Sequence, residues 1–197
     1  MMATVGDKHI KFWTPKSKNA QKGLFGKTEL MTSFACCAYD SQGRLFAGSA
    51  KGHIYLWVGH ELKQVLNNVH KDGFISAMRF EGGKIYSGGK DGNVVITDMN
   101  SLAQEKTISF GVMIRAIDVE GTAALIGCRN GTIYQVKNIN AGDKTAIMES
   151  HSDGEVWGIT AVDNDHIITT GDDNQIKKWN TASRKCEKTA VISNESR

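Results

Sequence analysis

One stretch of the chain decides its fold: residues 168–179 read Ile-Thr-Thr-Gly-Asp-Asp-Asn-Gln-Ile-Lys-Lys-Trp. Two segments with strand-like residues flank a short turn rich in Gly, Asp and Asn, the residue types that tolerate the positive φ of tight turns. The stretch therefore predicts a β-hairpin. The same pattern occurs three more times, at residues 45–57, 85–98 and 125–136.

The hairpins belong to an internal repeat. Apolar runs precede them at residues 34–39, 74–80, 113–119 and 156–162, and more polar runs follow them at residues 61–66, 104–109, 144–148 and 185–192. The glycines that end the first hairpin segments are Gly6, Gly48, Gly88, Gly127 and Gly171, which lie 42, 40, 39 and 44 residues apart. Four strands in each repeat of about 40 residues are typical of a β-propeller.

The length of the chain limits how many such units it can hold. A seven-bladed ring needs roughly 280 residues at about 40 per repeat, and this chain has 197. We therefore predict an all-β open arc of about four complete four-stranded blades plus part of a fifth. The predicted segments are residues 1–30 (the end of a preceding blade and a basic linker), 31–66, 67–110, 111–149 (a degenerate blade) and 150–197.

The last unit contains His151, Thr169, Asp173 and Trp179 at the positions of the structural tetrad of the WD-repeat family, which these repeats resemble. The resemblance implies that the aspartate accepts a hydrogen bond from the histidine. The histidine in turn contacts the hydroxyl and, through it, the tryptophan indole. A network of this kind fixes the register of a twisted sheet, and we expect it to be a scaffold.

The other units retain the tetrad only in part. The second complete unit keeps His70, Ser87 and Asp91 but has Thr97 in the tryptophan position. The first complete unit keeps Trp57, with Ala47 and Lys51 at two of the other positions, and the third has Asn130 and Val136.

Several short motifs occur in the order that echinoderm microtubule-associated protein-like proteins show. They are residues 8–14 (Lys-His-Ile-Lys-Phe-Trp-Thr), 22–27 (Lys-Gly-Leu-Phe-Gly-Lys), 52–57, 87–91 and 151–159. The resemblance implies a cytoplasmic, cytoskeletal protein that associates with tubulin or microtubules. The His-Glu-Leu-Pro motif of that family is absent, because residues 60–63 read His-Glu-Leu-Lys. The chain therefore resembles an internal stretch of such a protein, one that pairs with further blades of a parent chain or with a second copy.

Composition excludes several other classes of protein. The net charge of +3 and the absence of an aromatic platform flanked by arginines argue against nucleic-acid binding. No apolar run is long enough to span a membrane, and the polar N-terminal residues do not form a signal peptide. Four cysteines without a Cys-x-x-Cys pair make neither a disulfide framework nor a zinc site. We expect no metal and no cofactor.

Two groups of residues are candidates for binding a protein partner. The basic loop with Lys16, Lys18 and Lys22 suits an acidic surface such as the carboxylate-rich tails of tubulin, although a solvated loop is the simpler interpretation. Phe74 and Trp157 lie near the starts of innermost strands, where exposed aromatic residues are candidate hot spots and packing between blades is the alternative.

The function predicted from these features is a non-enzymatic interaction scaffold that is microtubule-associated and located in the cytoplasm, on the cytoskeleton or in a cilium. An adaptor of another signalling or ciliary complex is the first alternative. A propeller with a ligand or enzyme site in its channel is the second, and it needs converging acids, histidines or metal ligands from several blades. We predict no catalytic residues.

Overall fold

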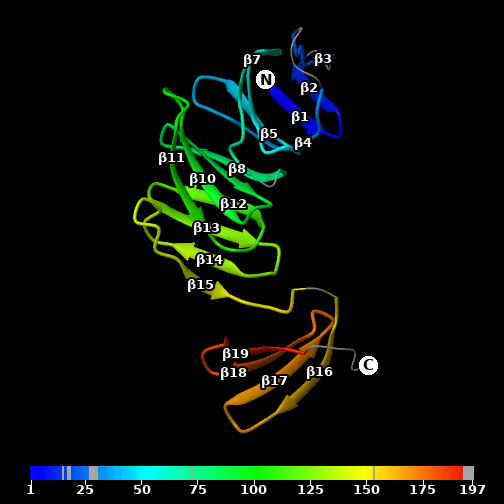
Figure 1. Cartoon of the computed structure of the whole chain (residues 1–197), viewed down its shortest axis with the longest axis vertical. Helices are drawn as coiled ribbons and strands as arrows, with labels where there is room; N and C mark the ends of the chain where they lie inside the picture. The colour runs from blue at the N-terminus through cyan, green and yellow to red at the C-terminus, as the bar shows by residue number, and fades with distance from the viewer. Residues whose placement is uncertain (15, 17–18, 27–30, 72, 153, 193–197) are drawn as a thin grey trace.

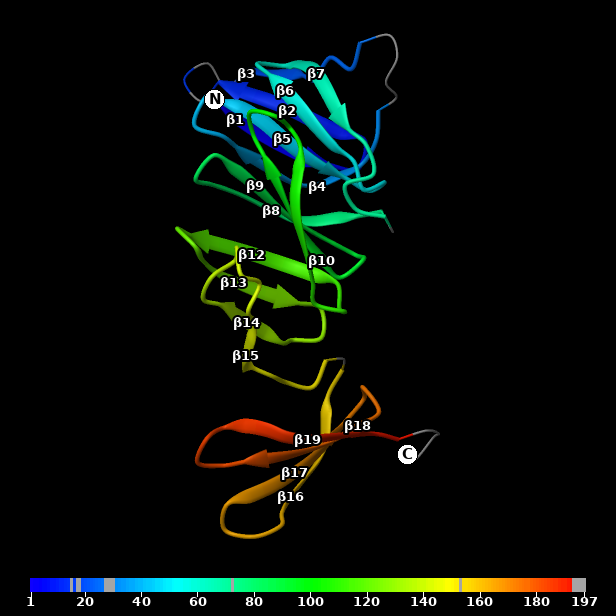
Figure 2. The same cartoon turned by 60° about the vertical axis from the view of Figure 1, so that its left-hand side comes forward.

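The computed structural model describes residues 1–14, 16, 19–26, 31–71, 73–152 and 154–192. These residues form 19 strands and no helix, arranged in five antiparallel sheets (Figure 1). Four sheets have four strands and the N-terminal one has three. The prediction of an all-β chain with four complete four-stranded units and part of a fifth is confirmed. The sheets follow one another as an open series and do not close into a ring (Figure 2).

We number the sheets in chain order. Sheet 1 contains β1 (Met2–Gly6), β2 (His9–Thr14) and β3 (Asn19–Lys22). Sheet 2 contains β4 (Phe34–Tyr39), β5 (Arg44–Ser49), β6 (Ile54–Val58) and β7 (Glu61–Leu66). Sheet 3 contains β8 (Ile75–Glu81), β9 (Lys84–Gly89), β10 (Asn93–Asp98) and β11 (Gln104–Ser109). Sheet 4 contains β12 (Ile114–Glu120), β13 (Ala123–Cys128), β14 (Ile133–Val136) and β15 (Thr145–Met148). Sheet 5 contains β16 (Val156–Ala161), β17 (His166–Gly171), β18 (Gln175–Asn180) and β19 (Lys185–Val191).

The central hairpin of each complete sheet closes through a residue with positive φ. Gly52, Gly92 and Gly131 have φ values of 77°, 74° and 77°, and Asn174 takes the same role in sheet 5 with a φ of 55°. Glycine and asparagine adopt this conformation at low cost, so the turn residues seen in the sequence determine where each hairpin reverses.

The core lies between successive sheets of the first four. Three apolar clusters join sheet 1 to sheet 2, sheet 2 to sheet 3, and sheet 3 to sheet 4. Glycine permits the close approach: a Cβ atom on Gly48 would lie 2.8 Å from Ile75 of the next sheet, and one on Gly88 would lie 2.5 Å from Ile114. The innermost strands β4, β8 and β12 therefore pack side by side.

Sheet 5 stands apart from this series (Figures 1 and 2). Val156 occupies the strand position of Ile75 and Ile114, yet 55 % of it is exposed, whereas those two isoleucines are fully buried. Gly127 of sheet 4 occupies the position of Gly48 and Gly88, but a Cβ atom there would meet only Ala116 of its own sheet, at 3.4 Å. The side-by-side packing of the first four sheets is thus not repeated between sheets 4 and 5.

Candidate functional site

Sheet 5 contains a continuous hydrogen-bonded network of four side chains. His151 precedes β16 and places Nδ1 2.9 Å from Oδ1 of Asp173 in the hairpin turn and Nε2 2.8 Å from Oγ1 of Thr169 on β17. The Nε1–H of Trp179 on β18 donates to the same Oγ1 at 2.7 Å. These partners suit a neutral imidazole that donates from Nδ1 to the carboxylate and accepts the threonine proton at Nε2. Strands β17 and β18, the turn between them and the loop before β16 are thereby held together.

Sheet 3 contains a shorter version of this network. His70 Nδ1 lies 2.9 Å from Asp91 Oδ1, and His70 Nε2 lies 2.9 Å from Ser87 Oγ. Thr97 stands in the tryptophan position, and its Oγ1 is buried with no partner among the described residues. Because Ser87 is fully buried, a substrate does not reach its hydroxyl in this structure.

Both aspartates are held by their own hairpin turns. Oδ1 of Asp91 accepts the Asn93 N–H at 3.1 Å, and Oδ1 of Asp173 accepts the Gln175 N–H at 3.1 Å. Burial on its own raises the pKa of each carboxyl, but the hydrogen bonds from the histidine and the turn outweigh it and hold the pKa of both below the ordinary value. The carboxylates are ionised acceptors that fix the turn.

Sheet 1 contains a third network that the sequence analysis missed. The Trp13 indole donates to Thr4 Oγ1 at 2.9 Å, and His9 Nε2 lies 3.0 Å from the same oxygen. Its histidine comes from β2 of the same sheet rather than from a preceding loop. The sequence spacing could have revealed this network. Thr4 and Trp13 are nine residues apart with a glycine between them, and the matching pair in sheet 5, Thr169 and Trp179, is ten residues apart with a glycine between them.

Sheet 2 replaces the network with aromatic packing. Trp57 is completely buried, with its ring centroid 5.8 Å from that of Phe12 and 5.0 Å from that of Phe25. Ala47 occupies the hydroxyl position of β5, and Trp57 Nε1 has no hydrogen-bond partner among the described residues. Aromatic packing therefore stabilises sheet 2, whereas hydrogen-bonded networks stabilise sheets 3 and 5.

The predicted binding residues lie in different parts of the molecule. Lys16 is exposed in the β2–β3 connection, Lys22 is exposed at the far end of β3, and Lys18 lies outside the described residues. Phe74 is half-buried before β8. The ring of Trp157 is 71 % exposed on β16, and its Nε1–H donates to Asp172 Oδ1 at 2.5 Å. The structure therefore does not bring the basic loop and the two aromatic residues into one site.

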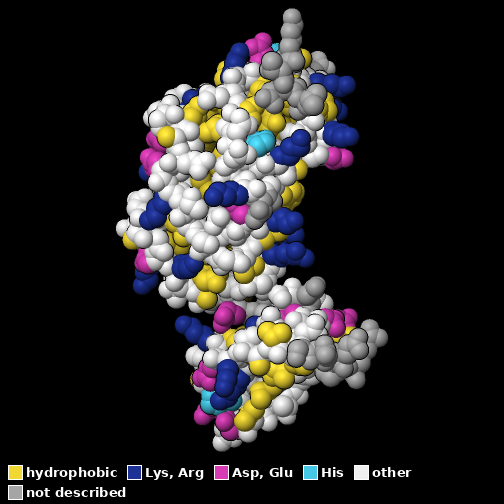
Figure 3. Space-filling model, in the orientation of Figure 1, with side chains coloured by type: hydrophobic (Ala, Val, Ile, Leu, Met, Phe, Trp, Pro, Cys, Tyr) yellow, Lys and Arg dark blue, Asp and Glu magenta, His cyan; other side chains and the backbone are white. Residues whose placement is uncertain are grey.

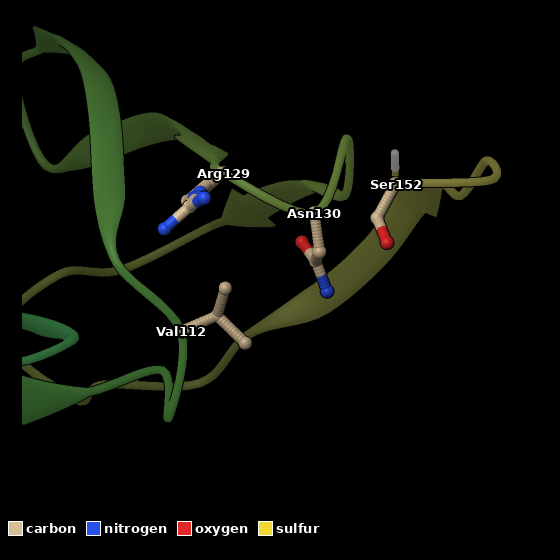
Figure 4. A pocket seen from close by; sticks show the side chains of 4 residues that line it. All are labelled: Val112, Arg129, Asn130 and Ser152. Atoms are coloured by element: carbon tan, nitrogen blue, oxygen red, sulfur yellow. The ribbon is translucent and has the colours of Figure 1, made fainter. Parts of the chain in front are cut away.

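A cavity of about 240 Å³ lies near the junction of sheets 4 and 5. It is lined by Val112, Arg129, Asn130 and Ser152 (Figure 4). Arg129 and Asn130 belong to the β13–β14 turn, and Ser152 belongs to the loop before β16. The described residues contain no group of three or more His, Cys, Asp or Glu side chains that could hold a metal ion. The described residues also contain no helix that is long and apolar enough to cross a bilayer.

Comparison with known proteins places these features in a wider context. The family model "WD domain, G-beta repeat" matches residues 142–180. The chain is 40 % identical over 197 residues to the ciliary WD repeat-containing protein ctxp80 of Euplotoides octocarinatus, an alignment that covers 99 % of this chain and 27 % of that protein. It is 25 % identical over 214 residues to echinoderm microtubule-associated protein-like 4 of Xenopus laevis, covering 97 % of this chain and 23 % of that protein.

Two further similarities are weaker or concern the fold alone. Cilia- and flagella-associated protein 44 of Mus musculus is 26 % identical over 166 residues, covering 68 % of this chain and 9 % of that protein. The crystal structure of the computationally designed Ika8 protein matches with a TM-score of 0.61 at 15 % identity, covering 94 % of this chain and 56 % of that one. The chain spans about a quarter of the length of the first two relatives, ctxp80 and echinoderm microtubule-associated protein-like 4.

Proposed function

Because this chain is built from WD repeats, we propose that it is part of a non-enzymatic interaction scaffold that associates with microtubules of the cytoskeleton or a cilium. The observation that carries the proposal is the 40 % identity to a ciliary WD repeat-containing protein across 99 % of the chain. The similarity to echinoderm microtubule-associated protein-like 4 supports the microtubule as the partner.

The residue networks support a scaffold rather than an enzyme. The histidines, hydroxyls and aspartates that resemble a catalytic set bond to one another and to their own turns. We assign them to holding each hairpin against the loop that enters its sheet. In this assignment residues 31–66, 67–110, 111–149 and 150–197 are four blades, and residues 1–30 end a preceding one.

We assign microtubule contact to the basic loop with Lys16, Lys18 and Lys22. Lys16 is exposed in the connection before β3, and Lys22 is the last residue of β3, all of whose residues are exposed. Lysines in such a position attract the carboxylates of an acidic surface through a salt-sensitive interaction.

Microtubule co-sedimentation tests this function. Reversing the charge of Lys16, Lys18 and Lys22 to Glu should reduce the bound fraction strongly, whereas the same reversal at Lys63, Lys137 and Lys185 serves as the control of equal charge. Equal binding by the two variants would exclude the basic loop. Failure of the unmodified chain and of a longer version to co-sediment would exclude the microtubule as partner.

A second candidate function, an adaptor of another protein complex, rests on Trp157. Its ring is 71 % exposed and is held in place by Asp172, which suits a hot spot for a protein ligand. Trp157→Ala should then abolish capture of that ligand while leaving co-sedimentation with microtubules unchanged.

A further inference from the structure

The hairpin turns of sheets 1 to 4 carry exposed cations along one edge of the molecule. Lys8 lies in the β1–β2 turn, Lys51 in the β5–β6 turn, Lys90 in the β9–β10 turn and Arg129 in the β13–β14 turn, and Lys71 lies in the loop that leads to β8. We call these five residues the basic edge. Figure 3 shows Lys and Arg side chains gathered along the right-hand side of the upper sheets.

Backbone hydrogen bonds fix the turns of the basic edge relative to one another. The Phe74 N–H donates to the Ala50 carbonyl of the sheet 2 turn at 2.9 Å, and the Phe74 carbonyl accepts the Lys90 N–H of the sheet 3 turn at 3.0 Å. The next loop repeats the arrangement, because Phe110 donates to Gly92 at 2.8 Å and Arg129 donates to Met113 at 2.8 Å. The turns that carry Lys51, Lys90 and Arg129 are therefore linked to one another through the loops between them.

The cations of the basic edge differ from those near the opposite strand ends in having no ion-pair partner among the described residues. On the opposite side, Arg44 pairs with Asp40 at 2.6 Å and Lys84 pairs with Glu105 at 2.6 Å, and Arg79 pairs with Asp118 at 3.3 Å.

Acids near the basic edge are engaged elsewhere. The Asp7 carboxylate accepts the Ser33 hydroxyl, and Asp91 is bonded to His70. Each of these carboxylates keeps its charge beside a lysine of the basic edge, but neither forms an ion pair with a cation of that edge among the described residues.

We propose that the basic edge binds an extended acidic segment of a partner protein. Packed sheets lie about 10 Å apart and an extended chain advances about 3.3 Å per residue, so cations on successive sheets match carboxylates at about every third residue. Single-stranded nucleic acid is the less favoured ligand, because it needs aromatic rings on which bases stack. Phe74, the aromatic residue between the turns of sheets 2 and 3, is half-buried.

The fourth complete sheet sets the limit of this surface. Asp172 in the β17–β18 turn stands where Lys90 and Arg129 stand in the preceding sheets, and Glu155 lies beside it, with its N–H donating to Asp172 Oδ2 at 2.9 Å. The sign of the charge reverses at sheet 5, so an acidic segment is attracted along sheets 1 to 4 and repelled beyond them. The proposal rests on the scaffold function only in that the ligand is a protein.

Fluorescence anisotropy with a labelled peptide of about twelve glutamates, long enough to pass four sheets, tests the proposal. The unmodified chain should bind this peptide in low salt and not a glutamine peptide of equal length. Reversing Lys51, Lys90 and Arg129 to Glu should weaken binding about tenfold or more. The control reversal of Lys63, Lys137 and Lys185 should change it less than about twofold, because those cations lie away from the basic edge.

Further arms of the experiment decide between outcomes. Variants that keep the charge (Lys51→Arg, Lys90→Arg and Arg129→Lys) should keep binding, and a circular dichroism spectrum matching the parent confirms that the reversed variant is folded. Equal losses in the two reversed variants would overturn the proposal, as would binding of the glutamine peptide. If single-stranded DNA binds more tightly than the glutamate peptide, and its binding is lost in the same charge-reversed variant, the proposal is overturned and the ligand of the basic edge is a nucleic acid. Because microtubules are absent from this assay, the result of peptide binding does not depend on whether the chain co-sediments with microtubules.

Discussion

Sheets 2 and 5 are built from the same repeat but are stabilised differently. Sheet 2 lacks the hydroxyl and acidic residues of the tetrad, yet Trp57, Leu45 and Phe46 are among the most deeply buried side chains of the chain. Sheet 5 has all four tetrad residues, yet Val156 and Ile159 on its innermost strand are 55 % and 71 % exposed. The tetrad therefore organises a sheet internally, whereas burial depends on contact with neighbouring sheets.

Replacing the tryptophan of each sheet should give the largest contrast between them. Trp57→Ala removes a completely buried ring and should cost about 3–5 kcal/mol of unfolding free energy. Trp179→Ala removes a half-buried ring and one hydrogen bond and should cost about 1–2 kcal/mol. Urea unfolding monitored by circular dichroism measures both, and equal costs would contradict the difference between the sheets.

Asp91→Asn should reveal the contribution of the hydrogen-bonded networks. The pKa of Asp91 is lowered in the folded state, so its stabilisation is present above the ordinary aspartate pKa of about 3.9 and is lost as the pH falls through the folded value. At pH 7 the variant should lose about 2 kcal/mol, because a bond to a charged acceptor is removed. The difference between variant and parent should shrink below about pH 4, and a difference that stays constant down to pH 2 would contradict the role of the ionised carboxylate.

Ala47→Ser should give the smallest effect, and in the stabilising direction. It introduces into sheet 2 the hydroxyl that sheets 3 and 5 have, next to the unpartnered Nε1 of Trp57. The new hydrogen bond should add about 0.5–1.5 kcal/mol to the unfolding free energy. The alanine parent is itself the control without an acceptor, and a serine variant no more stable than the parent would contradict the missing-acceptor explanation.

The sequence allowed the hairpins and hydrogen-bonded networks within each sheet to be predicted, but not the packing of one sheet against the next. Hairpins were predictable because Gly52, Gly92 and Gly131 have the conformational freedom that the turns require, and the networks of His70 and His151 were predictable from spacing. The network of Thr4, His9 and Trp13 was missed, because its histidine comes from within the hairpin.

The packing between sheets could not be read from the repeat. Ile114 and Val156 occupy the same position and have the same apolar character, but one is buried and the other is half exposed. The basic edge was also missed, because its four hairpin-turn cations lie 39 to 43 residues apart in sequence and come together only through the stacking of the sheets.

The most direct test of the account compares Gly88→Ala with Gly127→Ala in urea unfolding. The central claim is that sheets 2, 3 and 4 pack closely through such glycines, whereas sheet 4 presents an open face toward sheet 5. A methyl group on Gly88 would lie 2.5 Å from Ile114 and should cost about 2–3 kcal/mol, whereas one on Gly127 meets only an ordinary contact at 3.4 Å and should cost less than about 0.5 kcal/mol. Similar losses of about 2 kcal/mol or more in both variants would contradict the account, because they would mean that sheet 5 packs onto sheet 4 as the earlier sheets pack onto each other.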